Sequence, residues 1–280
     1  MNLEKNIVET VKTALFEDLQ GQKDLTARLI PEKRAASARV ITREDMILCG
    51  TAWVDEVFRQ LDPEVLVTWN YKDGDSVEAD CVLYTLEGKA RSLLTGERTA
   101  LNFLQTLSGV ATITGMFARK LTGTPTRLLD TRKTIPGLRL AEKYAVKCGG
   151  GCNHRMGLYD AFLIKENHIA ACGSITEAVH AAREIAPDRS VEIEVENIEG
   201  LKEAIAAKAD IVMLDNFPLE RIREAVEINA GRVKLEVSGD VNLDNIANIG
   251  ATGVDFVSVG SLTKHIKAIN LSMRFDMRIR

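Results

Sequence analysis

The stretch Ile211-Val212-Met213-Leu214-Asp215 is a short apolar run that ends on an acidic residue, and the second half of the chain repeats this pattern. Each run ends at or just before a charged or hydroxyl-bearing side chain, and helix-like stretches separate the runs. The runs are Thr126–Asp130, Ala161–Lys165, Val191–Val195, Ile211–Asp215, Val233–Val237 and Asp255–Val259. Strand then helix, repeated, predicts parallel strands joined by crossover helices. Because reactive groups gather at the carboxyl ends of barrel strands, the pattern indicates an enzyme.

The first part of the chain lacks this repeated alternation of strand-like and helix-like segments. Apolar residues at helical spacing predict an amphipathic helix over Asn2–Leu19, and strand-like segments follow between Ala36 and Tyr84. A helical stretch from about Ala90 to Leu121 is expected to be broken by its glycines, Gly96, Gly109 and Gly115.

These patterns predict an α/β protein, in which an α+β sandwich domain precedes an incomplete β/α barrel of six or seven strands. We expect residues 1–110 to form the N-terminal domain, with the segment 266–280 packing back on it. Residues 111–265 would form the barrel domain.

Bulk composition is that of an ordinary globular protein. The 280 residues are 45% hydrophobic and 27% charged, with a net charge of −4 that disfavours general nucleic-acid binding. No apolar run approaches the roughly 20 residues that span a bilayer. The first residues lack the pattern of a secretory signal, so we expect a cytoplasmic protein.

The five cysteines are irregularly spaced. Cys148 and Cys152 lie near His154 and His168, so a metal-binding module is one hypothesis. Reduced cysteines packed as small hydrophobic side chains are the simpler interpretation.

The strand ends carry three kinds of chemistry. Arg132, Lys133, Arg155 and Lys165 supply positive charge, and carboxylates follow two later strands at Glu194, Glu196 and Asp215. Ser238-Gly239 and Gly260-Ser261 offer backbone N–H groups that suit a phosphate. Together they predict a phosphorylated sugar with a divalent ion, for which Glu194 and Asp215 fit Mg²⁺.

Longer motifs identify a family. The chain resembles quinolinate phosphoribosyltransferase, also called nicotinate-nucleotide pyrophosphorylase (carboxylating), over nearly its whole length. The matching stretches are Asp24–Thr26, Gly96–Asn102, Asp130–Arg139, Lys143–Val146, Gly149–Arg155, Leu163–His168, Glu192–Glu196, Met213–Asn216 and Ser258–Gly260.

The resemblance implies a reaction. Phosphoribosyl would pass from 5-phosphoribosyl 1-pyrophosphate to quinolinate with decarboxylation, giving nicotinate mononucleotide, pyrophosphate and CO₂ on the route to NAD, with Mg²⁺ as cofactor. It also implies a homodimer, in which Arg98 reaches the neighbouring subunit's site.

The resemblance further assigns roles to residues. Quinolinate would be bound by Arg98, Thr131, Arg132, His154, Arg155 and Lys165. The phosphoribosyl donor would be bound by Lys133, Glu194, Asp215, Ser238, Gly239, Asp240, Val259, Gly260 and Ser261. The catalytic groups would be Lys133, Lys165, Glu194 and Asp215, and either lysine could deliver the final proton.

One position departs from the family pattern. Family members usually have Ser-Gly-Gly where this chain has Ser238-Gly239-Asp240. If Asp240 faces the ligand, its charge should weaken sugar-phosphate binding, whereas an Asp240 that caps the following helix would have little effect. A glycine's tolerance of positive φ would also be lost.

Two other functions compete with this one. A relative associated with molybdenum transport shares the fold, but is expected to lose some of the dicarboxylate-binding basic residues. A non-catalytic binding protein on the same scaffold is the second alternative.

Overall fold

The computed structural model describes residues 2–276, and the chain divides into two compact units. Unit 1 comprises Met1–Gly115, Thr134–Gly150 and Thr263–Arg280, and unit 2 comprises Met116–Lys133 and Gly151–Leu262. These units differ from the expected domains chiefly at residues 134–150, which the sequence analysis assigned to the barrel and the structure groups with unit 1.

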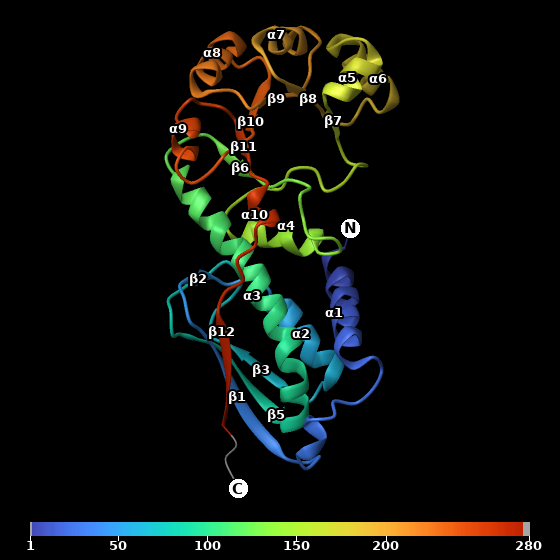
Figure 1. Ribbon diagram of the computed structural model, residues 1–280, viewed down its shortest axis with the longest axis vertical. Helices are drawn as coiled ribbons and strands as arrows, with labels where there is room; N and C mark the ends of the chain where they lie inside the picture. Colours follow the sequence, from blue (N-terminus) through green and yellow to red (C-terminus); the bar gives the residue numbers. More distant parts are fainter. Residues whose placement is uncertain (1, 277–280) are drawn as a thin grey trace. The chain divides into compact units, whose positions relative to one another are not determined.

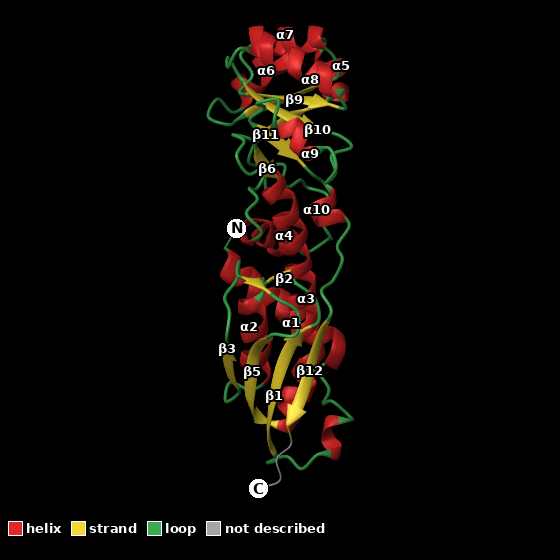
Figure 2. Cartoon of the chain, turned by 90° about the vertical axis from the view of Figure 1, so that its left-hand side faces the viewer, coloured by secondary structure: helices red, strands yellow, loops and turns green. Residues whose placement is uncertain are grey.

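Unit 1 is built on an antiparallel sheet in which four strands of the described chain pair in the order β12-β1-β5-β3 (Figure 2). Its elements are α1 (Leu3–Leu19), η1 (Ala27–Leu29), β1 (Ala35–Thr42), β2 (Met46–Ile47), α2 (Thr51–Leu61), β3 (Leu66–Trp69), β4 (Ser76–Val77), β5 (Val82–Lys89), α4 (Arg139–Cys148) and β12 (Leu271–Asp276). Helix α1 buries Ile7, Val11 and Leu15, one residue per turn, as the apolar spacing predicts.

Helix α2 was not predicted from the sequence, where only strand-like segments were identified between Ala36 and Tyr84. Its aromatic and β-branched residues are typical of strands, but Trp53, Val54, Val57 and Phe58 recur at helical spacing and are buried in the core of unit 1.

Helix α3 (Ala90–Lys120) is continuous from unit 1 into unit 2, so the expected breaks at its glycines are wrong. The glycines within unit 1 permit close packing instead. A Cβ on Gly96 would lie 2.6 Å from the Phe58 ring, and a Cβ on Gly109 would lie 2.3 Å from the carbonyl oxygen of Lys267. Packing therefore outweighs the low helix propensity of glycine here.

The C-terminal segment returns to unit 1. Residue Ile269 donates its backbone N–H to the carbonyl of Gln105 on α3 at 3.0 Å. Strand β12 then pairs antiparallel with β1, from Thr42 opposite Leu271 to Ser37 opposite Asp276.

Unit 2 contains a parallel sheet, and the described residues give it six strands in the order β6-β11-β10-β9-β8-β7. Helices α6, α7 and α8 lie along its outer side (Figure 1). Its elements are β6 (Arg127–Leu129), β7 (Phe162–Ile164), α5 (Glu166–Cys172), α6 (Ile175–Ile185), β8 (Val191–Val195), α7 (Ile198–Ala206), β9 (Ile211–Asp215), α8 (Leu219–Asn229), β10 (Lys234–Ser238), α9 (Ile246–Gly250) and β11 (Phe256–Ser258), and α10 (Ser261–Lys264) follows. The predicted fold class, an α/β protein with an incomplete barrel, is confirmed.

The segment that follows the glycine run lies beside the edge strand β6. Cys152 donates its N–H to the carbonyl of Leu128 at 2.8 Å and accepts the N–H of Asp130 at 3.1 Å. Arg155 then donates to the carbonyl of Ala161, the residue before the other edge strand, β7, at 3.3 Å. Residues 152–155 thus connect the two edges of the sheet by hydrogen bonds.

Across residues 2–276, no helix combines the length and the apolar character that crossing a bilayer requires.

We predict that Gly109→Ala destabilises the protein by about 1–3 kcal/mol, because its Cβ would collide with the Lys267 carbonyl. A glycine-to-alanine change within a helix ordinarily stabilises a protein by about 0.5–1 kcal/mol. A decrease in the free energy of unfolding would therefore indicate the close packing at Gly109. Urea unfolding measures the change, and Asn102→Ala, at an exposed position of α3, is the control. A Gly109→Ala protein as stable as the wild type would contradict the packing argument.

Candidate active site

A cavity of about 660 Å³ lies at the carboxyl ends of the unit 2 strands. It collects residues that are far apart in the sequence, because parallel strands end at the same edge of their sheet. Its lining residues are Thr131, Arg132, Lys133, His154, Arg155, Leu163, Lys165, Glu194, Met213, Asp215, Asn216, Glu236, Ser238, Gly239, Asp240 and Ser258.

The positive charges come from the two edges of the sheet and the segment between them. Arg132 and Lys133 follow β6, Lys165 follows β7, and Arg155 lies on the connecting segment. Burial and the neighbouring Arg132 lower the pKa of Arg155. The guanidinium groups of Arg132 and Arg155 repel each other in this partly buried cavity. An anion bound between them would offset that repulsion.

A completely buried carboxylate holds the connecting segment in place. Asp130 accepts the backbone N–H of His154 at 2.8 Å and the side-chain amide of Asn153 at 2.6 Å. Hydrogen bonds to a charged acceptor in a buried position are among the stronger ones in proteins. Asp130 therefore fixes where His154 and Arg155 enter the cavity.

His154 contacts two buried carboxyl groups beneath the cavity. Its Nε2 lies 2.9 Å from Glu192 Oε2 and 3.6 Å from Glu236 Oε2. Its Nδ1 accepts the backbone N–H of Arg155 at 2.8 Å, so the ring proton resides on Nε2 and is donated to Glu192. The imidazole is thereby fixed in tautomer and orientation.

Ionising both buried carboxyl groups would cost free energy, because their charges would repel each other away from water. Burial, and after it the charge of Glu192, raises the pKa of Glu236 to about 8, while His154 opposes the shift. Glu236 thus carries a proton at neutral pH, while Glu192 accepts the hydrogen bond from His154.

The acidic side of the cavity lies on the neighbouring strands β8 and β9. Glu194 accepts a bond from Lys165 Nζ at 2.7 Å with its Oε2. Asp215, at the end of β9, accepts the side-chain amide of Asn216 at 2.8 Å. These two carboxylates supply oxygen donors of the kind that Mg²⁺ takes when it keeps several of its waters.

The turn after β10 leaves no room for a side chain at its glycine. Gly239 has a φ of 95°, and a Cβ there would lie 2.0 Å from Asn216 Oδ1. Asp240 follows with a φ of 47°, a conformation that glycine adopts more readily. Asp240 is exposed and lines the cavity, and its carbonyl accepts the amide of Asn245 at 3.0 Å. The left-handed conformation explains why a glycine suits this position.

The structure brings most of the predicted site residues to this cavity, but not all. Arg98 belongs to unit 1, where it is exposed on α3. Val259 is buried, and Ser261 begins α10. Gly260 contacts the site indirectly, since a Cβ there would lie 2.9 Å from the Lys133 side chain.

The hypothetical metal module of Cys148, Cys152, His154 and His168 is not assembled in unit 2: among the described residues there, Cys152, His154 and His168 do not gather into a metal-ligating group. Cys152 accepts a hydrogen bond from Arg127 instead. His168 accepts the backbone N–H of Lys165 at 3.0 Å at the start of α5.

Strand periodicity could have revealed the residues that the sequence analysis left without a role. Alternate residues of a strand share a face, so each strand-end residue has a partner two positions earlier. Glu236 precedes Ser238 and Met213 precedes Asp215 in this way, and Glu192 precedes Glu194. The other residues missed are Leu163, Asn216 and Ser258.

We predict that the wild-type protein loses stability as the pH rises from about 5 to about 8, and that Glu236→Gln abolishes this loss. The unfolded carboxyl ionises near its model value of 4.5 whereas the folded one keeps its proton to about 8, so folding becomes less favourable as pH rises through this window. The wild type should lose on the order of 2–4 kcal/mol relative to the variant. Urea midpoints across this range measure it, with the exposed Glu227→Gln as control; parallel pH profiles for wild type and Glu236→Gln would refute the shift.

Comparison with known proteins places this arrangement in a family. Residues 24–108 match the N-terminal domain, and residues 110–274 the C-terminal domain, of quinolinate phosphoribosyl transferase. A solved nicotinate-nucleotide pyrophosphorylase from Francisella tularensis is 50% identical with a TM-score of 0.94, covering 99% of this chain and 98% of that one. A curated Bacillus subtilis (strain 168) relative, named "Probable nicotinate-nucleotide pyrophosphorylase (carboxylating)", is 43% identical over 92% of this chain and 89% of its own. A Mycobacterium leprae (strain TN) nicotinate-nucleotide pyrophosphorylase (carboxylating) is 39% identical over 95% of each chain. The chain therefore belongs to the quinolinate phosphoribosyltransferase family.

Proposed function

We propose that this protein transfers phosphoribosyl from 5-phosphoribosyl 1-pyrophosphate to quinolinate with decarboxylation, forming nicotinate mononucleotide, pyrophosphate and CO₂. One observation carries the proposal: five basic side chains share a cavity with two strand-end carboxylates and a glycine turn. The molybdenum-associated alternative was expected to lose basic residues, yet Arg132, His154, Arg155 and Lys165 all line this cavity.

Quinolinate would bind at the edge strands. It carries two adjacent carboxylates, and the Arg132 and Arg155 guanidinium groups offer the planar donor pairs that suit such groups. Burial lowers the pKa of Arg155, and repulsion from Arg132 lowers it further; this dianion would relieve the repulsion. His154, whose Nδ1 accepts the Arg155 N–H, would act as a positioning residue for that arginine.

The phosphoribosyl donor would bind at the remaining strand ends. Backbone N–H groups near Gly239 and Gly260 would accommodate its 5′-phosphate, and Lys133 beside Gly260 would neutralise charge. Glu194 and Asp215 would hold its ribose hydroxyls or the Mg²⁺ that accompanies it. When bound, that ion would neutralise charge developing on the pyrophosphate.

The chemistry then depends mainly on positioning. Holding the pyridine nitrogen against C1 of the ribose converts a bimolecular attack into an effectively unimolecular one. The quaternised ring withdraws electrons, so the adjacent carboxylate can leave as CO₂ with its electron pair held by the ring. A lysine ammonium returns a proton to that carbon, and Lys165, tethered to Glu194 at 2.7 Å, is held in place for this step.

We further propose that the protein works in the cytoplasm as a homodimer. Arg98 is exposed on α3, as it must be if it is to enter a neighbouring subunit's site.

The proposal predicts that purified protein forms nicotinate mononucleotide from quinolinate, phosphoribosyl pyrophosphate and Mg²⁺, and that omitting Mg²⁺ stops the reaction. Arg155→Ala should lower kcat/KM for quinolinate by roughly 30-fold or more, because it leaves a carboxylate of the bound quinolinate without its guanidinium partner. Product chromatography measures turnover, and Arg223→Ala, on the exposed side of α8, is the control. Quinolinate binding without product would favour the non-catalytic alternative.

Asp240→Gly should lower the KM for phosphoribosyl pyrophosphate by about 3- to 10-fold. The change removes a negative charge from the cavity wall and suits the left-handed backbone. Steady-state kinetics with each substrate varied in turn gives the answer, and the KM for quinolinate should stay unchanged. Asp240→Asn separates the two causes, since it removes the charge and keeps a side chain. Unaltered kinetics in Asp240→Gly would refute the prediction.

A further inference from the structure

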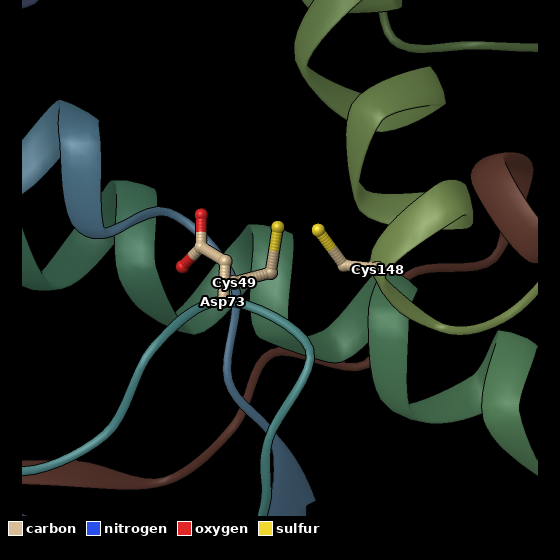
Figure 3. A group of neighbouring side chains, drawn as sticks. All are labelled: Cys49, Asp73 and Cys148. Carbon is tan, nitrogen blue, oxygen red and sulfur yellow. The ribbon is translucent and has the colours of Figure 1, made fainter.

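Two cysteines from distant parts of unit 1 face each other. Cys49 precedes α2 and Cys148 is the last residue of α4, and their Sγ atoms and a carboxylate oxygen of Asp73 all lie within 4.8 Å of one another. Figure 3 shows the two sulfur atoms side by side, with the Asp73 carboxylate on the other side of Cys49.

Both cysteines have rigid backbones. Cys49 donates its N–H to Ser108 Oγ at 3.0 Å, and its carbonyl accepts the Ser108 hydroxyl at 3.1 Å. Next to Cys148, Gly149 packs so closely on α3 that a Cβ would lie 2.4 Å from the Ala111 carbonyl oxygen. The two sulfur atoms are therefore held near each other by the fold itself.

Asp73 already has a structural role. Its Oδ1 accepts the backbone N–H groups of Gly50 and Thr51 at 3.0 and 3.1 Å, which caps α2, and its Oδ2 accepts the Tyr144 hydroxyl at 2.9 Å. A carboxylate with three donors is a poor candidate for a further metal bond. The reactive groups of this cluster are therefore the two thiols.

The two thiols are chemically unequal. Cys49 is fully buried, and burial raises its pKa. Cys148 is half-buried, and a hydrogen bond from the Cys49 thiol lowers its pKa. The more accessible sulfur is thus the better nucleophile, and a second thiol stands behind it.

We propose that Cys49 and Cys148 form a reversible disulfide when the protein meets a hydroperoxide. The Cys148 thiolate attacks the peroxide oxygen, the O–O bond breaks, and sulfenic acid and hydroxide result. The Cys49 sulfur then attacks the sulfenic sulfur, and water leaves with the Cys49 proton. Two thiols are oxidised and one peroxide is reduced. A dithiol reverses the bond by exchange.

The two Sγ atoms lie within 4.8 Å of each other and would approach to the S–S length of a disulfide, about 2.05 Å. The disulfide would connect the start of α2 to the end of α4, immediately before the glycine run that leads to His154 and Arg155.

The test uses full-length protein treated with a small excess of hydrogen peroxide. We expect two of the five thiols to become unreactive, a mass about 2 Da lower, and a nonreduced Cys49–Cys148 peptide that dithiothreitol releases. The urea midpoint should rise in the oxidised form, because the crosslink closes a long loop.

Single substitutions separate the two roles. Cys49→Ser should leave Cys148 as a sulfenic acid that dimedone labels, whereas Cys148→Ser should leave Cys49 unreactive. Cys81→Ser and Cys172→Ser are matched controls, in which the crosslink should form as in wild type. Circular dichroism confirms folding of each variant.

Three results would overturn the proposal. They are a dominant crosslink between other cysteines, oxidation of Cys148 to sulfinic acid in wild type without any Cys49 link, and purified protein with stoichiometric zinc that shields both thiols from peroxide. None of these readouts depends on the proposed transferase activity.

Discussion

The carboxylate of Asp130 is the group on which the arrangement of the site most depends. Asp130 lies just after the edge strand β6 and is completely buried, so its carboxylate depends on partners within the protein rather than on water. Among the donors are the His154 N–H and the Asn153 amide, both on the segment that connects the two edges of the sheet. The barrel is incomplete as a set of regular strands, and this segment supplies hydrogen bonds to both edges. The basic residues of the cavity therefore come from the two edges of the sheet and from the segment that connects them.

That origin explains why the site is divided by charge. Regular parallel strands bring carboxylates and small residues to the cavity from β8, β9 and β10, at positions fixed by the sheet register. The two edge strands and the segment between them bring guanidinium and ammonium groups, whose long side chains tolerate variable backbone positions. Glu236 lines the cavity and is buried together with Glu192, and its raised pKa keeps a proton on this pair. Protonation limits the negative charge under the cavity, which favours an anionic ligand above it.

Strand and helix positions in unit 2 were largely predictable, because each run has the length and apolar content of a buried strand. Strands β8 and β9 have the expected bounds. Helix α2 was not predictable from composition, since its buried aromatic and β-branched residues are typical of strands. The glycines of α3 were misinterpreted because the sequence does not show that another backbone packs against Gly109. Tertiary packing overrides local propensity in both helices.

For the site, strand-end residues were visible in the sequence, whereas their supports were not. Glu194 and Ser238 stand at strand ends, but Glu192 and Glu236 lie within apolar strands where a charged residue has no obvious partner. The missing partner is His154, which the fold brings beneath the cavity from the connecting segment. A buried charged residue within a strand is costly unless it is paired. Two such residues, each two positions before a strand-end polar residue, are therefore a signal for an internal hydrogen-bond network in a barrel of this kind.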